Sequence, residues 1–231
     1  MSYDKPCFLG SIDGSSVKTI FELGSLSLVD GVKLRDRYGA SVYSFECNPK
    51  SLEMCRKTFE ELEDKSNIYL VEKAVSSKSG KLTFHPMDPD KHDNPGASSA
   101  LILDHTNRNG KERDEIEKGY QSTITVDAIS VDDFCEENGI EQIDMLCMDL
   151  QGFEMEALKG MERMLGTVKY IITESCVVPS YVGGSCFSVM EKYLVERGFK
   201  YEVSTRFGRS RPDQTIKHFC EFDVLFTRIS P

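Results

Sequence analysis

Short apolar runs alternate with segments of helical periodicity along most of this chain. This is the pattern of β-α units, in which a helix provides the crossover between two parallel strands. We therefore expect an α/β fold built on a mainly parallel sheet. The expected strands are residues 18–22, 41–45, 67–71, 81–84, 124–126, 143–148, 168–173, 199–203 and 219–226.

Residues with strong capping preferences mark the ends of several expected helices. Asn48, followed by a proline, can begin one helix, and Ser130 can begin another that Gly139 ends. Apolar residues three and four positions apart predict a helix from Gly152 to Leu165. The remaining helices are expected at residues 29–38 and around 187–194.

The length of 231 residues suits a single domain, which we expect to span residues 1–231. Residues 1–17 precede the first strand as an N-terminal extension. Residues 85–122 are polar, contain a charged run and lack a helical period. We interpret this segment as an insertion that covers part of a ligand site.

Charge and cysteine content narrow the possible partners and the compartment. The formal net charge is −10 and no stripe of Lys or Arg is present, which argues against nucleic acid as a partner. The eight cysteines form no C-x-x-C pair, a pattern typical of free thiols in a reducing compartment. The chain begins without the features of a signal peptide, and no apolar run is long enough to span a bilayer. We expect a cytoplasmic protein, and the sequence does not indicate its oligomeric state.

Acidic residues follow or end four of the expected strands: Glu22, Glu46, Asp149 and Glu174. In an open α/β sheet, ligands bind beyond the carboxyl ends of the strands. Several carboxylates in one crevice repel one another unless a ligand or a metal uses them. The sequence therefore predicts the ligand site at this edge of the sheet.

A tight turn at Gly24 and the carboxylate of Glu46 predict an adenosine site. Glu46 ends the next strand, where a carboxylate can accept hydrogen bonds from the ribose hydroxyls. The full G-x-G-x-x-G pattern of dinucleotide sites is absent, because Leu26 and Val29 take the later glycine positions. The missing pyrophosphate cradle favours S-adenosylmethionine over NAD(P), although an NAD(P)-linked oxidoreductase stays open as an alternative.

Several motifs occur in a fixed order along the chain, and Asp149–Glu154 is the most specific of them. The others are Phe21–Ser25, Val42–Pro49, Ala74–Ser76, Ala97–Ser99, Ile129–Phe134 and Ile143–Met148, with Glu156–Gly160 extending the last. On these residues the chain resembles the FkbM family of methyltransferases, from about Thr19 to Phe226.

The resemblance implies a Rossmann-like class I methyltransferase fold. This is a seven-stranded, mainly parallel sheet with one antiparallel strand and helices on both faces. It also implies an S-adenosyl-L-methionine-dependent O-methyltransferase (EC 2.1.1) that acts on a hydroxyl of a sugar, a glycan or a small polar metabolite. The chain departs from the family at Leu26 and Leu28, where many members have Asn and Gly, and at Cys147, where many have Lys. These departures leave a non-catalytic binding or scaffold protein as a further alternative.

The expected donor-binding residues surround the strand ends: Glu22, Gly24, Ser25, Glu46, Cys47, Asn48, Lys73, Ala74, Ser99 and Asp149.

For catalysis we expect Asp149, with Glu174 as its partner on the neighbouring strand. Together with Gln151 and Glu154 these two residues could offer oxygen ligands to Mg²⁺ or Mn²⁺. Alternatively, Glu154 interacts with a helix N-terminus and Gln151 caps a backbone group. Ser98 and Tyr181 could line the site, and His105 in the insertion could act as a base.

Overall fold

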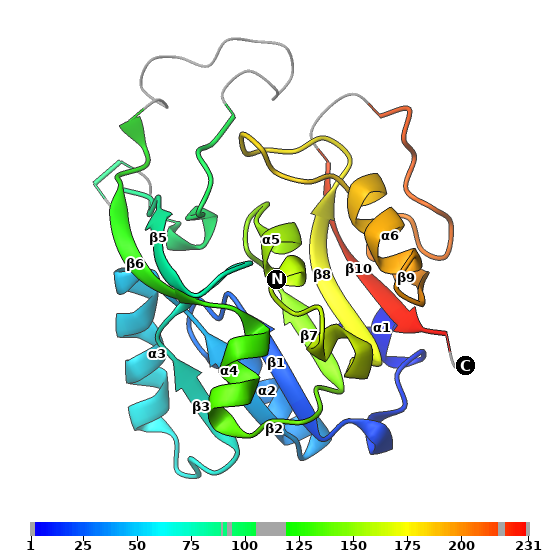
Figure 1. The fold of residues 1–231 in the computed structure, drawn as a ribbon, viewed down its shortest axis with the longest axis horizontal. Helices are drawn as coiled ribbons and strands as arrows, with labels where there is room; N and C mark the ends of the chain where they lie inside the picture. Colours follow the sequence, from blue (N-terminus) through cyan, green and yellow to red (C-terminus); the bar gives the residue numbers. More distant parts are fainter. Residues whose placement is uncertain (1–2, 89, 92–93, 105–118, 217–219, 230–231) are drawn as a thin grey trace.

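A central sheet of seven strands forms the middle layer of the molecule (Figure 1). The computed structural model describes residues 3–88, 90–91, 94–104, 119–216 and 220–229. The strand order is β3-β2-β1-β7-β8-β10-β9, and β10 runs antiparallel to both of its neighbours. The strands are β1 (Thr19–Leu23), β2 (Ser41–Phe45), β3 (Ile68–Val71), β7 (Met145–Met148), β8 (Tyr170–Cys176), β9 (Phe199–Ser204) and β10 (Glu221–Arg228). The expected class I methyltransferase fold is confirmed.

Helices cover both faces of this sheet because its strands alternate their apolar side chains between two cores. On β1, Phe21 and Leu23 pack in one core and Ile20 in the other. The first core contains α4 (Val131–Asn138), α5 (Glu154–Lys159) and α6 (Phe187–Val195). The second contains α1 (Pro6–Leu9), α2 (Val29–Tyr38) and α3 (Pro49–Glu61). Short 3₁₀ helices lie at Gly14–Ser16, Pro95–Ala97 and Met164–Thr167.

The expected caps begin and end the helices as the sequence indicates. Asn48 accepts a hydrogen bond from the amide of Lys50 at 3.2 Å, and Ser130 accepts one from the amide of Asp133 at 3.1 Å. Gly139 has a φ of 64°, the left-handed conformation in which glycine commonly ends a helix.

The predicted helix from Gly152 to Leu165 is wrong in extent, since α5 covers only Glu154–Lys159. Gly160 lies so close to the backbone of Ser76 that a Cβ there would be 2.1 Å from the Ser76 carbonyl oxygen. The carbonyl of Gly160 accepts a hydrogen bond from the amide of Asp132 at 3.0 Å. A contact with distant parts of the chain therefore ends the helix, and local periodicity does not reveal such a contact.

A second, three-stranded sheet was not expected. It contains β4 (Ala74–Val75), β6 (Ile124–Ile129) and β5 (Gly80–Phe84), with β6 in the middle. The described part of residues 85–122 continues from it through isolated bridges between His85 and Ser99 and between Met87 and Gln121. This segment therefore adds to the layer beside the sheet edge where the site is expected.

All eight cysteines lie in the described residues, and each is a free thiol. Within the described residues, no helix combines the length and the apolar character that crossing a membrane would require. The cytoplasmic location stays a prediction.

We predict that Gly160→Ala strongly destabilises the fold. The new methyl group would collide with the Ser76 carbonyl, so the unfolding free energy from urea denaturation should fall by about 2 kcal/mol or more. Gly166→Ala is the matched control, because a Cβ there meets no described atom within 4 Å. Equal effects of the two substitutions would contradict the proposed collision.

Candidate active site

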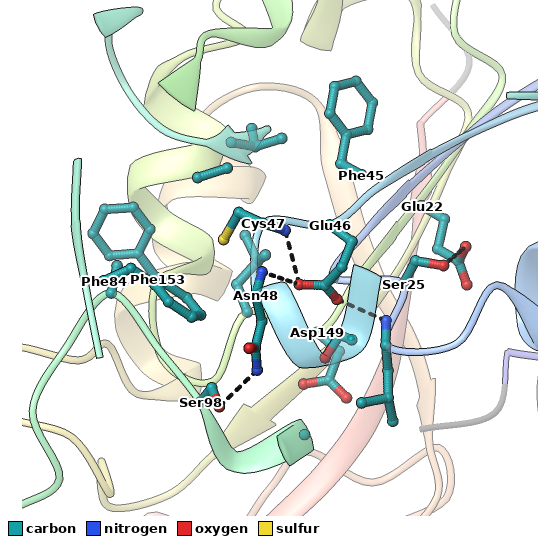
Figure 2. A pocket seen from close by; sticks show the side chains of 18 of the residues that line it. Glu22, Ser25, Phe45, Glu46, Cys47, Asn48, Phe84, Ser98, Asp149 and Phe153 are labelled. Carbon is teal, nitrogen blue, oxygen red and sulfur yellow. Dashed lines mark hydrogen bonds between the residues drawn. The ribbon is translucent and has the colours of Figure 1, made fainter. Parts of the chain in front are cut away.

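A large cavity opens at the carboxyl ends of β1, β2 and β7 (Figure 2). β1 pairs with β2 on one side and β7 on the other, so the strand order reverses at this point. The cavity encloses about 890 Å³, part of it open to solvent.

Gly24 allows the ends of β1 and β7 to approach closely. Its φ is 87°, and a Cβ at this position would be 2.1 Å from the carbonyl oxygen of Asp149. Only glycine therefore fits here. The amides of Gly24 and Ser25 both donate to the carbonyl of Phe45 at 3.0 Å, so the turn holds the ends of β1, β2 and β7 close together.

Leu26 and Leu28 continue this turn with φ values of 57° and 67°. The left-handed region costs a non-glycine residue about 1–2 kcal/mol, and Asn and Gly adopt it most easily. The turn nevertheless forms here, with the amide of Leu28 donating to Ser25 Oγ at 3.1 Å and its side chain fully buried.

Glu46 lies at the end of β2 with its carboxylate among backbone amides, as Figure 2 shows. Its Oε1 accepts hydrogen bonds from Cys47 and Asn48, and its Oε2 accepts one from Leu26, all at 2.8 Å. Burial raises the pKa of Glu46, and these backbone hydrogen bonds partly lower it. Two donors saturate Oε1, so Oε2 is the oxygen with room for a ligand hydroxyl.

Glu22 is buried beside the same turn. It accepts hydrogen bonds from Ser25 Oγ at 2.9 Å and from Ser44 Oγ at 2.6 Å. Gly31 of α2 leaves room for this carboxyl group, since a Cβ there would lie 2.7 Å from Glu22 Oε2. Burial raises the pKa of Glu22 to about 7, although the two serine hydrogen bonds oppose the shift.

Asp149 and Glu174 are bridged by the side-chain amide of Gln151. Gln151 Nε2 donates to Asp149 Oδ1 at 2.7 Å and to Glu174 Oε2 at 2.8 Å. Its Oε1 accepts a hydrogen bond from the hydroxyl of Tyr181 at 2.9 Å. Burial raises the pKa of Asp149, and burial together with the charge of Asp149 raises the pKa of Glu174 to about 10. Glu174 is therefore uncharged at neutral pH.

Asp149, Gln151 and Glu174 lie together, but not in the way that oxygen ligands of Mg²⁺ or Mn²⁺ would. The donor nitrogen of Gln151, not an oxygen, lies within hydrogen-bonding distance of both carboxyl groups. Glu154 Oε1 instead accepts from the amides of Leu150 and Gly152 at 2.8 and 3.2 Å. Within the described ranges, no three His, Cys, Asp or Glu side chains are placed to hold a metal ion. These residues do not fit a metal site.

Comparison with known proteins gives the family. The family described as "Methyltransferase FkbM domain" matches residues 25–201, which is more than half of the chain. The chain belongs to this family.

Two curated relatives of this FkbM domain are named as methyltransferases, one for a 2-O position and one for hexuronic acid. The 2-O-methyltransferase NoeI of Sinorhizobium fredii is 27% identical over 72% of this chain and 60% of its own length. The hexuronic acid methyltransferase AglP of Haloferax volcanii is 27% identical over 58% of this chain and 47% of its own length. The chain therefore spans only about half to 60% of the relatives that it matches.

A solved FkbM structure has the same fold. The methyltransferase FkbM from Methylobacillus flagellatus KT superimposes with a TM-score of 0.56 at 12% identity, over 96% of this chain and 46% of that one. At this identity the likeness concerns the fold alone.

Most of the expected donor-binding residues of this FkbM domain line the cavity. They are Glu22, Gly24, Ser25, Glu46, Cys47, Asn48, Lys73, Ala74 and Asp149. Ser99 is not among the lining residues, because its hydroxyl donates to the carbonyl of Gln151 at 2.9 Å. Ser98 lines the cavity and accepts a hydrogen bond from Asn48 Nδ2 at 3.0 Å. Glu174 and Tyr181 line a smaller neighbouring recess.

Some lining residues were not expected from the sequence. Phe84 and Phe153 add aromatic rings to the cavity (Figure 2). Tyr3 reaches it from the N-terminal extension, which the Lys5–Asp223 ion pair and the buried Phe8 hold against the sheet. Phe153 lies within the Asp149–Glu154 motif, and this position could have indicated that it lines the site. No local sequence pattern marks Tyr3. His105, like His92 and His218, lies outside the described residues.

We predict that Glu22→Gln stabilises the protein more strongly as the pH rises. The pKa of Glu22 is about 7 in the folded chain against an ordinary 4.5, so the unfolded chain loses this proton first. The carboxyl's contribution to stability is present below about pH 4.5 and is lost as the pH rises toward 7. Glutamine has no such proton. The difference in unfolding free energy between variant and wild type should therefore grow by about 2 kcal/mol between pH 5 and 8.

Urea denaturation at several pH values measures this difference. Glu53→Gln serves as the control, because Glu53 lies exposed on α3. A Glu22→Gln effect that does not change with pH would show that this carboxyl group is not protonated preferentially in the folded state.

Proposed function

We propose that this FkbM domain transfers a methyl group from S-adenosylmethionine to a hydroxyl group of a sugar or glycan. The observation that carries the proposal is that the glycine turn and the Glu46 carboxylate line one cavity at the strand-order switch. Family membership supports the donor, the name of NoeI supports transfer to an oxygen, and the name of AglP supports an acceptor of the sugar class.

The cavity offers a different environment to each part of the donor. Glu46 Oε2 can accept a ribose hydroxyl, and Phe84 and Phe153 with Ala74 provide apolar surface for the adenine ring. The methionyl end would lie near the Gly24 turn. Lys73 is the one cation among the described lining residues, against the acids Glu22, Asp30, Glu46 and Asp149. This acidic surface suits a donor that carries a positive sulfonium.

Asp149 is the proposed base. S-adenosylmethionine supplies an activated methyl group, which moves from sulfur to the acceptor oxygen as the S–C bond breaks and the O–C bond forms. The hydroxyl proton moves to the carboxylate of Asp149, whose raised pKa makes it a stronger base than an exposed aspartate. Gln151 holds that carboxylate in place through the 2.7 Å hydrogen bond. The walls of the cavity hold donor and acceptor in line, which lowers the entropic part of the barrier.

The two other classes of function fit the geometry less well. An NAD(P)-linked oxidoreductase needs a pyrophosphate cradle, and at this turn Leu26 and Val29 place side chains where the cradle has glycines. A scaffold protein that had lost its site would not need the left-handed turn at Leu26 and Leu28. That turn is kept, with the amide of Leu26 directed at Glu46.

We predict that Glu46→Ala weakens binding of S-adenosylhomocysteine by at least about tenfold. The variant loses a charged hydrogen bond to the ribose, and such bonds contribute about 1.5–3 kcal/mol. Isothermal titration calorimetry measures the affinity, and a thermal melt checks that the variant is folded. Glu53→Ala, on the exposed side of the following helix, should bind like the wild type. No heat with the wild type, or equal affinities of all three proteins, would refute the donor site.

We predict that Asp149→Asn lowers kcat by about 100-fold or more while the affinity for S-adenosylhomocysteine changes little. Asparagine keeps the size of the side chain but cannot take the acceptor proton, and general-base catalysis commonly contributes about 10²–10⁴-fold. Release of S-adenosylhomocysteine, measured with an acceptor found by screening glycosides, gives kcat. A variant with full turnover would remove Asp149 from the role of base.

A further inference from the structure

Tyr3 lines the donor cavity, although it lies outside residues 25–201, which match the family. The residue is only 3% exposed, and its side chain packs in the second core together with Phe8. The ion pair between Lys5 and Asp223 of β10 holds the same segment against the sheet. A part of the chain outside the matched family region therefore forms a fixed wall of this cavity.

Tyr3 borders the part of the cavity that the ends of β1 and β7 form. Burial raises the pKa of Tyr3, and the charges of Glu22 near the end of β1 and of Asp149 after β7 raise it further. Lys73 and Ala74 line the cavity beyond the end of β3, which lies two strands away from β1. Because the adenine ring is proposed to contact Ala74, Tyr3 lies on the side left for the methionyl end of the donor.

The Tyr3 hydroxyl can donate a hydrogen bond to a ligand. Its raised pKa means that the phenol keeps its proton at physiological pH. In the part of the chain that the structure describes, this hydroxyl forms no hydrogen bond. The hydroxyl of Ser25, on the neighbouring turn, already donates to Glu22 at 2.9 Å. Tyr3 therefore provides a neutral donor at this end of the cavity.

The methionyl end of S-adenosylmethionine carries an ammonium group and a carboxylate. Glu22 and Asp30 line the cavity within electrostatic reach of Tyr3, and their charge suits the ammonium group. The same acids repel the carboxylate, which a neutral hydroxyl can bind through a charge-assisted hydrogen bond. Resting on the proposed methyl transfer, we propose that Tyr3 is a donor-binding residue whose hydroxyl donates to the α-carboxylate of S-adenosylmethionine.

A matched pair of ligands tests this contact: S-adenosylhomocysteine and its decarboxylated form, which lacks only the α-carboxylate. The variant is Tyr3→Phe, which removes the hydroxyl and keeps the ring in the second core. Isothermal titration calorimetry on the full chain measures each affinity. We expect the variant to bind S-adenosylhomocysteine at least about tenfold more weakly than the wild type, because a hydrogen bond to a charged group is lost. The decarboxylated ligand should bind both proteins equally.

Tyr69→Phe is the control, because Tyr69 is 44% exposed on β3 and loses the same atom. It should bind both ligands like the wild type. Unchanged affinity of Tyr3→Phe for S-adenosylhomocysteine overturns the proposal. An equal loss of affinity for both ligands also overturns it, since the hydroxyl would then support the shape of the cavity without contacting the carboxylate.

A second comparison needs no variant. The wild type should bind the decarboxylated ligand at least about tenfold more weakly than S-adenosylhomocysteine, and equal affinities would overturn the proposed contact.

The wild-type titration with S-adenosylhomocysteine keeps this proposal distinct from the proposed function. If the wild type binds S-adenosylhomocysteine and Tyr3→Phe binds it equally well, the Tyr3 contact is wrong and the donor site stands. If the wild type does not bind S-adenosylhomocysteine, the proposed methyl transfer is wrong, and the Tyr3 proposal falls with it.

Discussion

The close approach of Gly24 to the carbonyl oxygen of Asp149 is the contact on which the candidate site depends. It brings the ends of β1 and β7 together, and the same turn donates two amides to the end of β2. Because of this arrangement, Glu46 and Asp149 line one cavity although they lie far apart in the sequence. A side chain at Gly24 would separate these strand ends, and the donor and acceptor parts of the site with them.

The site also concentrates buried carboxyl groups, at a cost in stability. Burial raises the pKa values of Glu22, Glu46, Asp149 and Glu174, so part of the charge is lost to protonation at neutral pH. Backbone amides and serine hydroxyls stabilise the charge that stays. A cationic donor would relieve the remaining repulsion. Natural proteins often accept such local instability where the groups are used in binding or catalysis.

The sequence predicted the architecture well because strand and helix periods are local properties. Most of the donor-binding residues that it indicated also line the cavity, since strand ends in a parallel sheet share one edge. It did not predict the structural features that depend on contacts between distant parts of the chain. The end of α5 at Gly160 is set by the backbone of Ser76, and Tyr3 reaches the cavity from the N-terminal extension. The role of Gln151 also required the structure, because only geometry distinguishes an amide that donates to two carboxyl groups from one that binds a metal.

A crystal structure of the chain with bound S-adenosylhomocysteine would show whether Glu46 and Asp149 serve one donor site. We expect the ribose to lie within hydrogen-bonding distance of Glu46 Oε2, with the sulfur atom directed toward Asp149. A nucleoside bound anywhere else, or a Glu46 carboxylate that touches only the backbone amides of the chain when the ligand is present, would contradict this expectation.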